Sequence, residues 1–293
     1  MTLLDGKALA AQIKEEIKKE TAAIIDRGEK APHLAAILVG DDPASQTYVA
    51  SKEKACHETG ITSSVYKYPA NTSENDLLQA IDFLNKDDEI DGFIVQLPLP
   101  AHIHVERIIE AIDPLKDVDG FHPVNLGKML TGQPGFIPAT PLGIMQLLER
   151  YNIETEGKHC VVVGRSNIVG TPISVLMSRK SKPGNATVTL CHSYTQNLAE
   201  ICRSADILIA AIGKPNFITA DRVKDGAVVI DVGIHRIPDE SHEKGYYITG
   251  DVDFAEVSKK VEWITPVPGG VGSMTIAALL MNTLKAWKIR NKE

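Results

Sequence analysis

The chain has 293 residues, of which 43% are hydrophobic and 24% are charged, proportions typical of a globular protein. This length favours two domains of ordinary size or one large α/β domain. No run approaches the roughly eighteen apolar residues of a membrane span, and a net charge of -7 repels nucleic acid and anionic membranes. We therefore expect a small-molecule partner, with no nucleic acid and no membrane.

In chain order, the first half is predicted to contain a helix at 7–27, a strand at 33–40, a helix at 44–59, a strand at 62–68, a helix at 73–85 and a strand at 91–100. The first helix follows from apolar residues recurring on one helical face, and the strands from nearly continuous apolar or β-branched runs. The prolines of 91–100 end the last of these strands. The first half is therefore predicted to be a β-α-β-α-β unit after an opening helix.

The segment 113–138 is rich in Pro, Gly and Asp, so we expect irregular structure and the crossing between two domains there or just beyond it. Thr140 as N-cap and Pro141 in the first turn predict a helix to residue 151. Further strands are predicted at 158–164, 186–190, 206–213 and 226–233, with helices after Gly170, at 197–203 and at 272–288. This alternation predicts an α/β fold with parallel sheets and covering helices.

The N-terminus and the cysteines indicate a cytoplasmic protein. MTLLDGK places Asp5 after two leucines and lacks a basic segment followed by an apolar one, so no secretory signal is expected. The four cysteines are few for this length and have no CxxC spacing, which is typical of reduced thiols rather than of disulfides or a zinc site. They are Cys56, Cys160, Cys191 and Cys202.

Residues 161–172, VVVGRSNIVGTP, have the pattern of a phosphate-binding loop. Gly164 ends a strand and Gly170 begins a helix, which brings backbone N–H groups and a positive helix end toward a phosphate. Ser166 stands where the usual GxGxxG has its second glycine, and Gly170 falls one residue late. A tight turn without a ligand is the alternative, but the place after the first strand of a βαβ unit favours a dinucleotide.

Three other motifs allow a functional and a structural interpretation each. Tyr48 and Lys52 share one helix face, or form a solvated lysine packed along a tyrosine. Gln96 ends an apolar strand, where α/β sheets bind ligands, or it satisfies loop backbone groups. Asp119 in DVDG supplies a carboxylate for a ligand, or forms an Asx turn.

A glycine-rich turn and a pair of histidines also allow more than one interpretation. The small and rigid residues of PVPGGVGSMT (266–275) allow a ligand to approach the backbone closely, or form a complex turn. His102 and His104 have no third ligand at helical or strand spacing, so we predict surface histidines and no metal site.

Five motifs in this order are similar to those of the bifunctional methylenetetrahydrofolate dehydrogenase and methenyltetrahydrofolate cyclohydrolase family: YVASK, VQLPLP, DVDG, VVGRSNIVGTP and PVPGGVGSMT. PATPLG and DVGI fit as well, so the resemblance spans nearly the whole chain. Two positions depart from the family pattern. Ser273 replaces the Pro of GVGPMT before the last helix, and His235 follows DVGI, where Asn is common, beside the expected nicotinamide pocket.

The resemblance implies a smaller βα folate domain at 1–140, a Rossmann-like NADP-binding domain at 141–271, and a C-terminal helix, 272–293, that packs back on the first domain. It also implies a homodimer that oxidises 5,10-methylenetetrahydrofolate to 5,10-methenyltetrahydrofolate with NADP. The enzyme then hydrolyses this product to 10-formyltetrahydrofolate, which supplies purine biosynthesis. Tetrahydrofolate derivatives are therefore the expected partners.

By similarity, folate lies in a cleft between the domains. Tyr48 would stack on it and Asp119 would hydrogen-bond the pterin ring, while Lys52 and Gln96 flank the one-carbon unit. These four residues are the implied catalytic group. The resemblance adds substrate contacts from Leu97, Pro98, Pro266, Gly269 and Gly270, and cofactor contacts from Gly164, Arg165, Ser166, Ile168, His192, Ser193 and Ile234.

The chemistry of the oxidation constrains the charge of Lys52. Hydride loss from methylenetetrahydrofolate leaves a delocalised amidinium cation, which a protonated lysine would oppose. We therefore expect Lys52 to act partly as the neutral amine, oriented by Gln96 and Tyr48. It would accept a proton from the water that attacks the methenyl carbon and return it to the departing ring nitrogen.

The end of the second Rossmann strand predicts NADP rather than NAD. NAD-selective proteins have Asp or Glu there, which repels a 2′-phosphate, whereas this strand runs into CHSYT. Arg165 and Ser193 can bind the phosphate, and a protonated His192 can contribute. The alternative is that Arg165 pairs with a surface carboxylate.

Two other functions stay open at this point. A shikimate-type dehydrogenase also joins a βα domain bearing a lysine to a Rossmann domain, but its polar substrate needs neither Tyr48 for stacking nor Asp119 for a pterin. A non-catalytic folate or nucleotide sensor of this architecture should have lost Lys52, which this chain retains.

Overall fold

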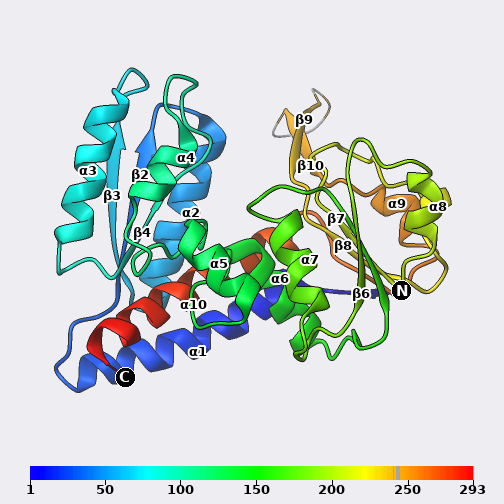
Figure 1. Cartoon of the computed structure of the whole chain (residues 1–293), viewed down its shortest axis with the longest axis horizontal. Helices are drawn as coiled ribbons and strands as arrows, with labels where there is room; N and C mark the ends of the chain where they lie inside the picture. The colour runs from blue at the N-terminus through cyan, green and yellow to red at the C-terminus, as the bar shows by residue number, and fades with distance from the viewer. Residues whose placement is uncertain (240, 242–244, 293) are drawn as a thin grey trace. The chain divides into compact units, whose positions relative to one another are not determined.

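The computed structural model describes residues 1–239, 241 and 245–292 (Figure 1). The chain divides into two compact units. Unit 1 comprises Met1–Ala10 and Thr140–Thr275, and unit 2 comprises Ala11–Ala139 and Ile276–Glu293. Each unit has parallel strands covered by helices, so the predicted α/β fold class is confirmed.

Unit 2 is built on a three-stranded parallel sheet in the order β3-β2-β4. Its strands are β2 (His33–Val39), β3 (Thr62–Tyr68) and β4 (Gly92–Val95). Ala35, Ile37 and Val39 share one face of β2 and pack against α3 (Glu74–Lys86) and α4 (Val105–Ala111). The connection through α2 (Pro43–Thr59) covers the other face, as right-handed crossovers require for this strand order.

Within unit 2, the C-terminal parts of the two longest helices lie side by side. Lys288 of α10 (Val271–Asn291) forms an ion pair with Glu20 of α1 (Gly6–Asp26). The indole Nε1 of the buried Trp287 donates to the Lys30 carbonyl at 2.9 Å. Asn282, also on α10, donates to the carbonyls of Val118 and Ile137 at 2.8 and 2.9 Å, and so holds the loop that contains DVDG.

Unit 1 contains a six-stranded sheet in the order β1-β11-β8-β7-β5-β6, in which every neighbouring pair is parallel. Its strands are β1 (Thr2–Leu3), β5 (His159–Val163), β6 (Thr187–Cys191), β7 (Ile207–Ala210), β8 (Val228–Asp231) and β11 (Trp263–Ile264). The other elements of unit 1 are α6 (Ala139–Arg150), α7 (Gly170–Ser178), α8 (Leu198–Arg203), η1 (Ala220–Arg222), the antiparallel hairpin of β9 (His235–Pro238) and β10 (Tyr246–Thr249), and α9 (Phe254–Val257).

Several elements differ from the sequence prediction. The segment expected to be irregular contains α5 (Pro123–Thr131), which begins where His122 Nδ1 accepts the Val124 N–H at 3.0 Å. Thr140 is not an N-cap, because α6 begins at Ala139, and the Thr140 hydroxyl instead lies 3.0 Å from that of Thr275. The two-residue strands β1 and β11 and the hairpin β9–β10 were not predicted, since such short segments carry no periodicity.

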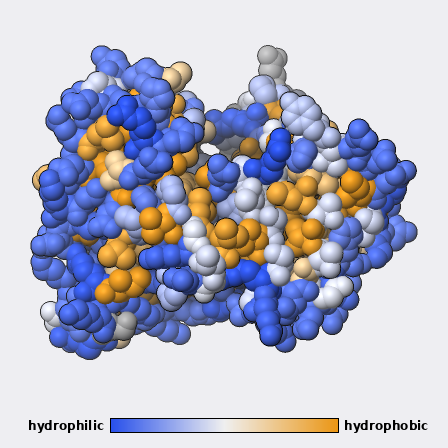
Figure 2. Space-filling model, in the orientation of Figure 1, coloured by the Kyte–Doolittle hydropathy of each residue, from blue (hydrophilic) through white to orange (hydrophobic). Residues whose placement is uncertain are grey.

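Among the described residues, no helix combines the length and apolar character that a bilayer crossing requires. Figure 2 shows a face on which hydrophilic residues surround smaller apolar areas. The exposed large apolar side chains include Phe83, Leu130, Tyr194 and Ile234, which come from separate elements of the chain.

Candidate functional site

Lys52 is nearly buried on α2, with 8% of its surface exposed. The helix begins at Pro43, after Asp42 accepts the Ser45 N–H at 2.7 Å, and this fixes its register. Lys52 Nζ donates to Gln96 Oε1 at 3.1 Å. Tyr48 lies one turn earlier on the same face, and burial raises the pKa of its phenol.

Gln96 continues the central pairing of the sheet by one residue beyond β4. Its N–H donates to the Ile37 carbonyl at 2.9 Å, and its side-chain Nε2 donates to the Leu97 carbonyl at 2.6 Å. Since the amide nitrogen is used in this way, the amide oxygen is directed at Lys52. The structural role weighed for Gln96, satisfying loop backbone groups, is therefore real and also orients its acceptor.

In DVDG, the turn is made by Asp117, which the sequence analysis did not single out. Its buried carboxylate accepts the N–H groups of Gly120, Phe121 and His122 at 3.1, 3.2 and 2.8 Å, and the Asn125 amide at 2.8 Å. Asp119 therefore does not form the Asx turn. In the described part of the chain, no group donates a hydrogen bond to its carboxylate.

Asp119 is electrostatically coupled to the lysine. Burial raises the pKa of its carboxyl and the Asp117 carboxylate raises it further, while the Lys52 ammonium lowers it. The structure thus brings Lys52, Gln96 and Asp119 into one polar group, with Leu97 and Pro98 following directly after Gln96. Among the described residues, the Lys52 amine has one hydrogen-bond partner and the Asp119 carboxylate has no donor, so both keep groups available to a ligand.

The loop after β5 in unit 1 requires both of its glycines. Gly164 has φ 120°, and a Cβ there would lie 2.0 Å from the Ala211 carbonyl oxygen. A Cβ on Gly170 would lie 1.9 Å from the Gly164 carbonyl oxygen. The Ser166 hydroxyl accepts the N–H groups of Val169 and Gly170 at 3.2 and 3.3 Å, so part of the helix end expected to face a phosphate already has a partner.

The loop after β5 begins beside the end of β6, because the Gly164 N–H donates to the Cys191 carbonyl at 2.9 Å. Arg165 and Ser193 are exposed there, and Ile168 and His192 are partly exposed. No carboxylate within the described ranges forms an ion pair with Arg165. An exposed cation beside an exposed hydroxyl fits an anionic ligand group.

The turn that contains Pro266 and Gly270 is tightly packed. A Cβ on Gly270 would lie 2.5 Å from the Pro266 carbonyl oxygen, and a Cβ on Gly6 would lie 2.1 Å from the Gly270 carbonyl oxygen. The Lys7 N–H donates to the Gly269 carbonyl at 2.7 Å. This packing accounts for Gly270 structurally, whereas Gly269 is partly exposed.

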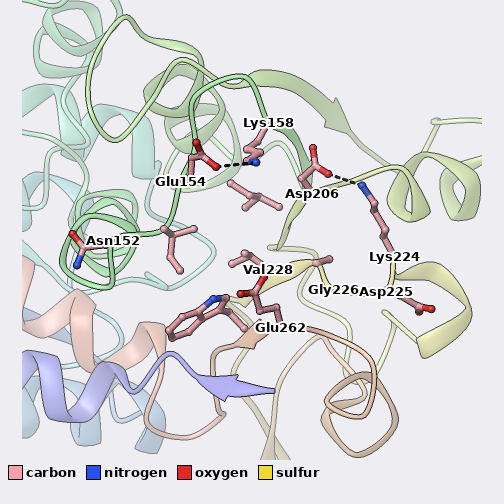
Figure 3. Close-up of a pocket in the computed structure, with 13 residues that line it drawn as sticks. Asn152, Glu154, Lys158, Asp206, Lys224, Asp225, Gly226, Val228 and Glu262 are labelled. Atoms are coloured by element: carbon pink, nitrogen blue, oxygen red, sulfur yellow. Dashed lines mark hydrogen bonds and ion pairs between the residues drawn. The ribbon is translucent and has the colours of Figure 1, made fainter.

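A groove of about 490 Å³ lies elsewhere on unit 1 (Figure 3). Its lining residues come from the amino ends of β5, β7, β8 and β11, whereas ligands of parallel α/β sheets bind at the carboxyl ends. Lys158 pairs with Glu154 at 3.0 Å and Lys224 with Asp206 at 2.6 Å. The groove holds none of the predicted site residues, and its cations are already paired.

The histidines considered for a metal have other partners. His102 Nε2 lies 2.8 Å from the Thr72 carbonyl oxygen, and His104 Nδ1 lies 2.7 Å from Glu74 Oε2. Within the described residues, no three His, Cys, Asp or Glu side chains are placed to hold a metal ion.

Two family models match the chain. The tetrahydrofolate dehydrogenase/cyclohydrolase catalytic domain matches residues 4–119, and the tetrahydrofolate dehydrogenase/cyclohydrolase NAD(P)-binding domain matches residues 138–291. The bifunctional protein FolD of Flavobacterium psychrophilum is 62% identical over 286 residues, which cover 98% of this chain and 97% of the relative.

Solved structures are similar over the whole length. The bifunctional FolD methylenetetrahydrofolate dehydrogenase/cyclohydrolase from Campylobacter jejuni is 53% identical with a TM-score of 0.92, covering 99% of both chains. The Trypanosoma brucei enzyme complexed with NADP cofactor and inhibitor is 37% identical with a TM-score of 0.94, covering 100% of this chain and 99% of that one. A shikimate dehydrogenase, at 14% identity and a TM-score of 0.51, shares the fold alone.

Proposed function

Because the chain belongs to the tetrahydrofolate dehydrogenase/cyclohydrolase family, we propose that Lys52, Gln96, Tyr48 and Asp119 carry its two reactions. The enzyme oxidises 5,10-methylenetetrahydrofolate to 5,10-methenyltetrahydrofolate with NADP and hydrolyses this product to 10-formyltetrahydrofolate. The observation that carries the assignment is the nearly buried Lys52 hydrogen-bonded to the oriented oxygen of Gln96.

The proposed hydrolysis depends on the hydrogen bond between Lys52 Nζ and Gln96 Oε1. In the proposed scheme Lys52 reacts as the neutral amine, which can donate one N–H to Gln96 Oε1 and keep its lone pair available. Water attacks the methenyl carbon and Lys52 Nζ accepts one of its protons, which leaves a carbinol. The same proton then passes to the ring nitrogen as its bond to the carbon breaks, while the carbinol hydroxyl becomes the formyl oxygen and releases its proton to solvent. Lys52 ends the cycle as it began, and the product retains the formyl group on the other nitrogen.

Asp119 and Tyr48 bind the substrate in this scheme. The Asp119 carboxylate is free of donors from the described residues, so it can accept N–H groups of the pterin ring. Tyr48, one turn from Lys52, offers an aromatic face for stacking. Burial raises the pKa of Asp119, so this carboxyl is already desolvated before a ligand donates a hydrogen bond to it.

Unit 1 fits a dinucleotide at the carboxyl ends of β5 and β6. NADP, when bound, supplies the hydride acceptor for the oxidation. The residues proposed to hold it are Gly164, Arg165, Ser166, Ile168, His192, Ser193 and Ile234. Arg165 and Ser193 are exposed together without a competing carboxylate from the described ranges, which supports binding of the 2′-phosphate.

The residues proposed for the substrate side also include Leu97, Pro98, Pro266, Gly269 and Gly270. In domain terms, we assign folate binding to 1–140 with the C-terminal segment 272–293, and NADP binding to 141–271. Tetrahydrofolate derivatives are then the small-molecule partners.

We also propose a homodimer in the cytoplasm, with no nucleic acid or membrane partner. All four cysteines are free and buried, which suits a reducing compartment, and the net charge of -7 disfavours nucleic acid. Light scattering at working concentration should give twice the chain mass of 31.8 kDa. A monomer mass would contradict the homodimer.

The proposed function is tested by one assay with two optical signals. The purified protein is mixed with methylenetetrahydrofolate and NADP, and reduced cofactor and methenyl product are followed separately. We expect reduced cofactor to accumulate faster than methenyl product, because hydrolysis removes the latter. Absence of both signals would overturn the proposal. Accumulation of reduced cofactor and methenyl product in equal amounts would contradict the cyclohydrolase activity.

A further inference from the structure

Asp251 is fully buried and holds the loop that follows β7. Its Oδ2 accepts the N–H groups of Ile212 and Gly213 at 2.6 and 3.0 Å, and its Oδ1 accepts the Lys214 N–H at 2.9 Å. Three successive backbone donors on one carboxylate fix the course of this loop. None of these residues was singled out from the sequence.

His235 supplies a further hydrogen bond to the same carboxylate. Its Nε2 lies 2.7 Å from Asp251 Oδ1, and its side chain is 18% exposed against 0% for that of Asp251. Since a carboxylate only accepts, Nε2 carries the proton and donates. His235 begins β9 and Asp251 follows β10, so this bond links the segment after β8 to the carboxylate that also holds the segment after β7.

Asp231, at the end of β8, holds the other side of the network. Its Oδ1 accepts the N–H groups of Gly233 and Asp251, both at 2.9 Å, and its Oδ2 accepts the Val252 N–H at 2.9 Å. A Cβ on Gly233 would lie 2.4 Å from Asp251 Oδ1, and one on Gly250 would lie 1.8 Å from Asp231 Oδ2. The chain therefore has no room for a side chain at Gly233 or Gly250, where it passes these carboxylates.

The network lies at the carboxyl edge of the sheet, where open α/β sheets bind dinucleotides. With the phosphate-binding loop and Arg165 after β5, and Ser193 after β6, assigned to the phosphates of the cofactor, the nicotinamide half would extend over β7 and β8. Ile234 is 44% exposed at this edge. Its two neighbours are both held, Gly233 by Asp231 and His235 by Asp251.

We propose that His235 is a positioning residue for the nicotinamide half of NADP. Through Asp251 it fixes the backbone of residues 212–214, and with Gly233 it fixes the exposed Ile234. It does not touch the reacting atoms. The inference rests on the proposed placement of the cofactor at this edge.

The test compares His235→Ala with His235→Gln, because a Gln amide nitrogen reaches about as far from the backbone as His Nε2. We expect the Ala variant to raise the Kd and KM for NADP roughly tenfold, the effect of losing about 1.4 kcal/mol. The KM for methylenetetrahydrofolate and the hydrolysis of supplied methenyltetrahydrofolate without cofactor should stay unchanged. The Gln variant should recover most of the NADP affinity.

A second measurement reads the positioning directly. Amide hydrogen exchange at residues 212–214 should be slow in the wild type and the Gln variant and faster in the Ala variant. Equal NADP affinity in the wild type and the Ala variant, a Gln variant as weak as Ala, or unchanged exchange at 212–214 would each overturn the inference. A wild-type protein that binds no NADP would instead contradict the proposed function.

Discussion

At the scale of single residues, the two aspartates of DVDG have different roles. The Asp117 carboxylate accepts hydrogen bonds from three backbone N–H groups of its own loop and from the Asn125 side chain on α5. Among the described residues, none donates a hydrogen bond to the Asp119 carboxylate. The Lys52 amine and the Gln96 amide oxygen are paired in the same unit. Replacing Asp117 should therefore disrupt the turn, whereas replacing Asp119 should lower the affinity for folate.

Asp119→Ala should weaken folate binding by roughly 1.5 to 3 kcal/mol, because a buried pterin would lose a charge-assisted partner. NADP binding, measured by titration on the same protein, serves as the control and should not change. An equal loss for both ligands would point to misfolding instead.

The pH dependence of folate binding follows from the same carboxyl. Burial and Asp117 raise the pKa of Asp119 in the free protein, so it takes up a proton at a higher pH than an ordinary aspartate. Wild-type folate affinity should fall as pH drops through this raised pKa. The Ala variant should lack that step, and a step of equal size in both proteins would assign it to another group.

Arg165→Ala should reduce the preference for NADP over NAD, since the guanidinium contributes charge-assisted hydrogen bonds to the 2′-phosphate. We expect the ratio of kcat/KM values to fall roughly tenfold or more. Arg165→Lys keeps the charge without the planar fork and should lie between. Equal efficiencies with both cofactors in the wild type, or a ratio that the Ala change leaves alone, would rule out this role.

At the scale of elements, the strands and helices that were predictable are those with sustained patterns. β2 is a continuous apolar run and α3 starts after its Ser73 cap, so both follow from local chemistry. α5 could not be predicted in the same way, because its start depends on His122 and on the loop that Asp117 holds. Local sequence also does not distinguish Asp117 from Asp119, since only the folded loop decides which carboxylate meets the backbone donors.

Gly164→Ala should destabilise unit 1 and weaken NADP binding. The new Cβ would lie 2.0 Å from the Ala211 carbonyl oxygen, and the left-handed backbone adds roughly 1 to 3 kcal/mol of strain. Gly157→Ala is the matched control, because Gly157 also has positive φ but no atom within 4 Å of a Cβ. Chemical denaturation should show a larger loss for Gly164, and equal losses would argue against the contact.

Asp231 should make the stability of unit 1 pH-dependent. Burial raises the pKa of its carboxyl from 3.8 to about 6, against three backbone N–H donors that lower it. The folded state thus holds this proton more tightly than the unfolded state, so its contribution is present below about pH 4 and is lost as pH rises toward 6. Each pKa unit corresponds to about 1.4 kcal/mol, which gives roughly 3 kcal/mol.

The Asp231→Asn variant isolates this contribution, because an amide does not titrate. Its destabilisation relative to the wild type, measured by urea unfolding, should be larger near pH 4.5 than near pH 7. A difference that stays constant over this range would show that Asp231 is ionised in the folded protein throughout.

At the scale of the whole molecule, the two reactions place different demands on the two units. By the proposed assignments, oxidation uses the residues proposed for NADP in unit 1 and the Lys52 group of unit 2. In the proposed scheme, hydrolysis of methenyltetrahydrofolate uses the Lys52 group and the residues that bind the substrate, and it needs no cofactor. Substitutions in the cofactor loops should therefore separate the two activities, whereas loss of Lys52 should remove hydrolysis wherever the methenyl compound comes from.

Hydrolysis of supplied methenyltetrahydrofolate by Lys52→Met is the most direct test of the assignment of Lys52 as the base. Methionine keeps an apolar stem but accepts no proton, and Lys54→Met, an exposed neighbour on the same helix, is the control. After subtraction of spontaneous hydrolysis, we predict that Lys52→Met hydrolyses the methenyl compound at least about a hundredfold more slowly than the wild type. Folate binding should survive in this variant, and the control should stay active. An unchanged rate in Lys52→Met, corrected for spontaneous hydrolysis, would contradict the account.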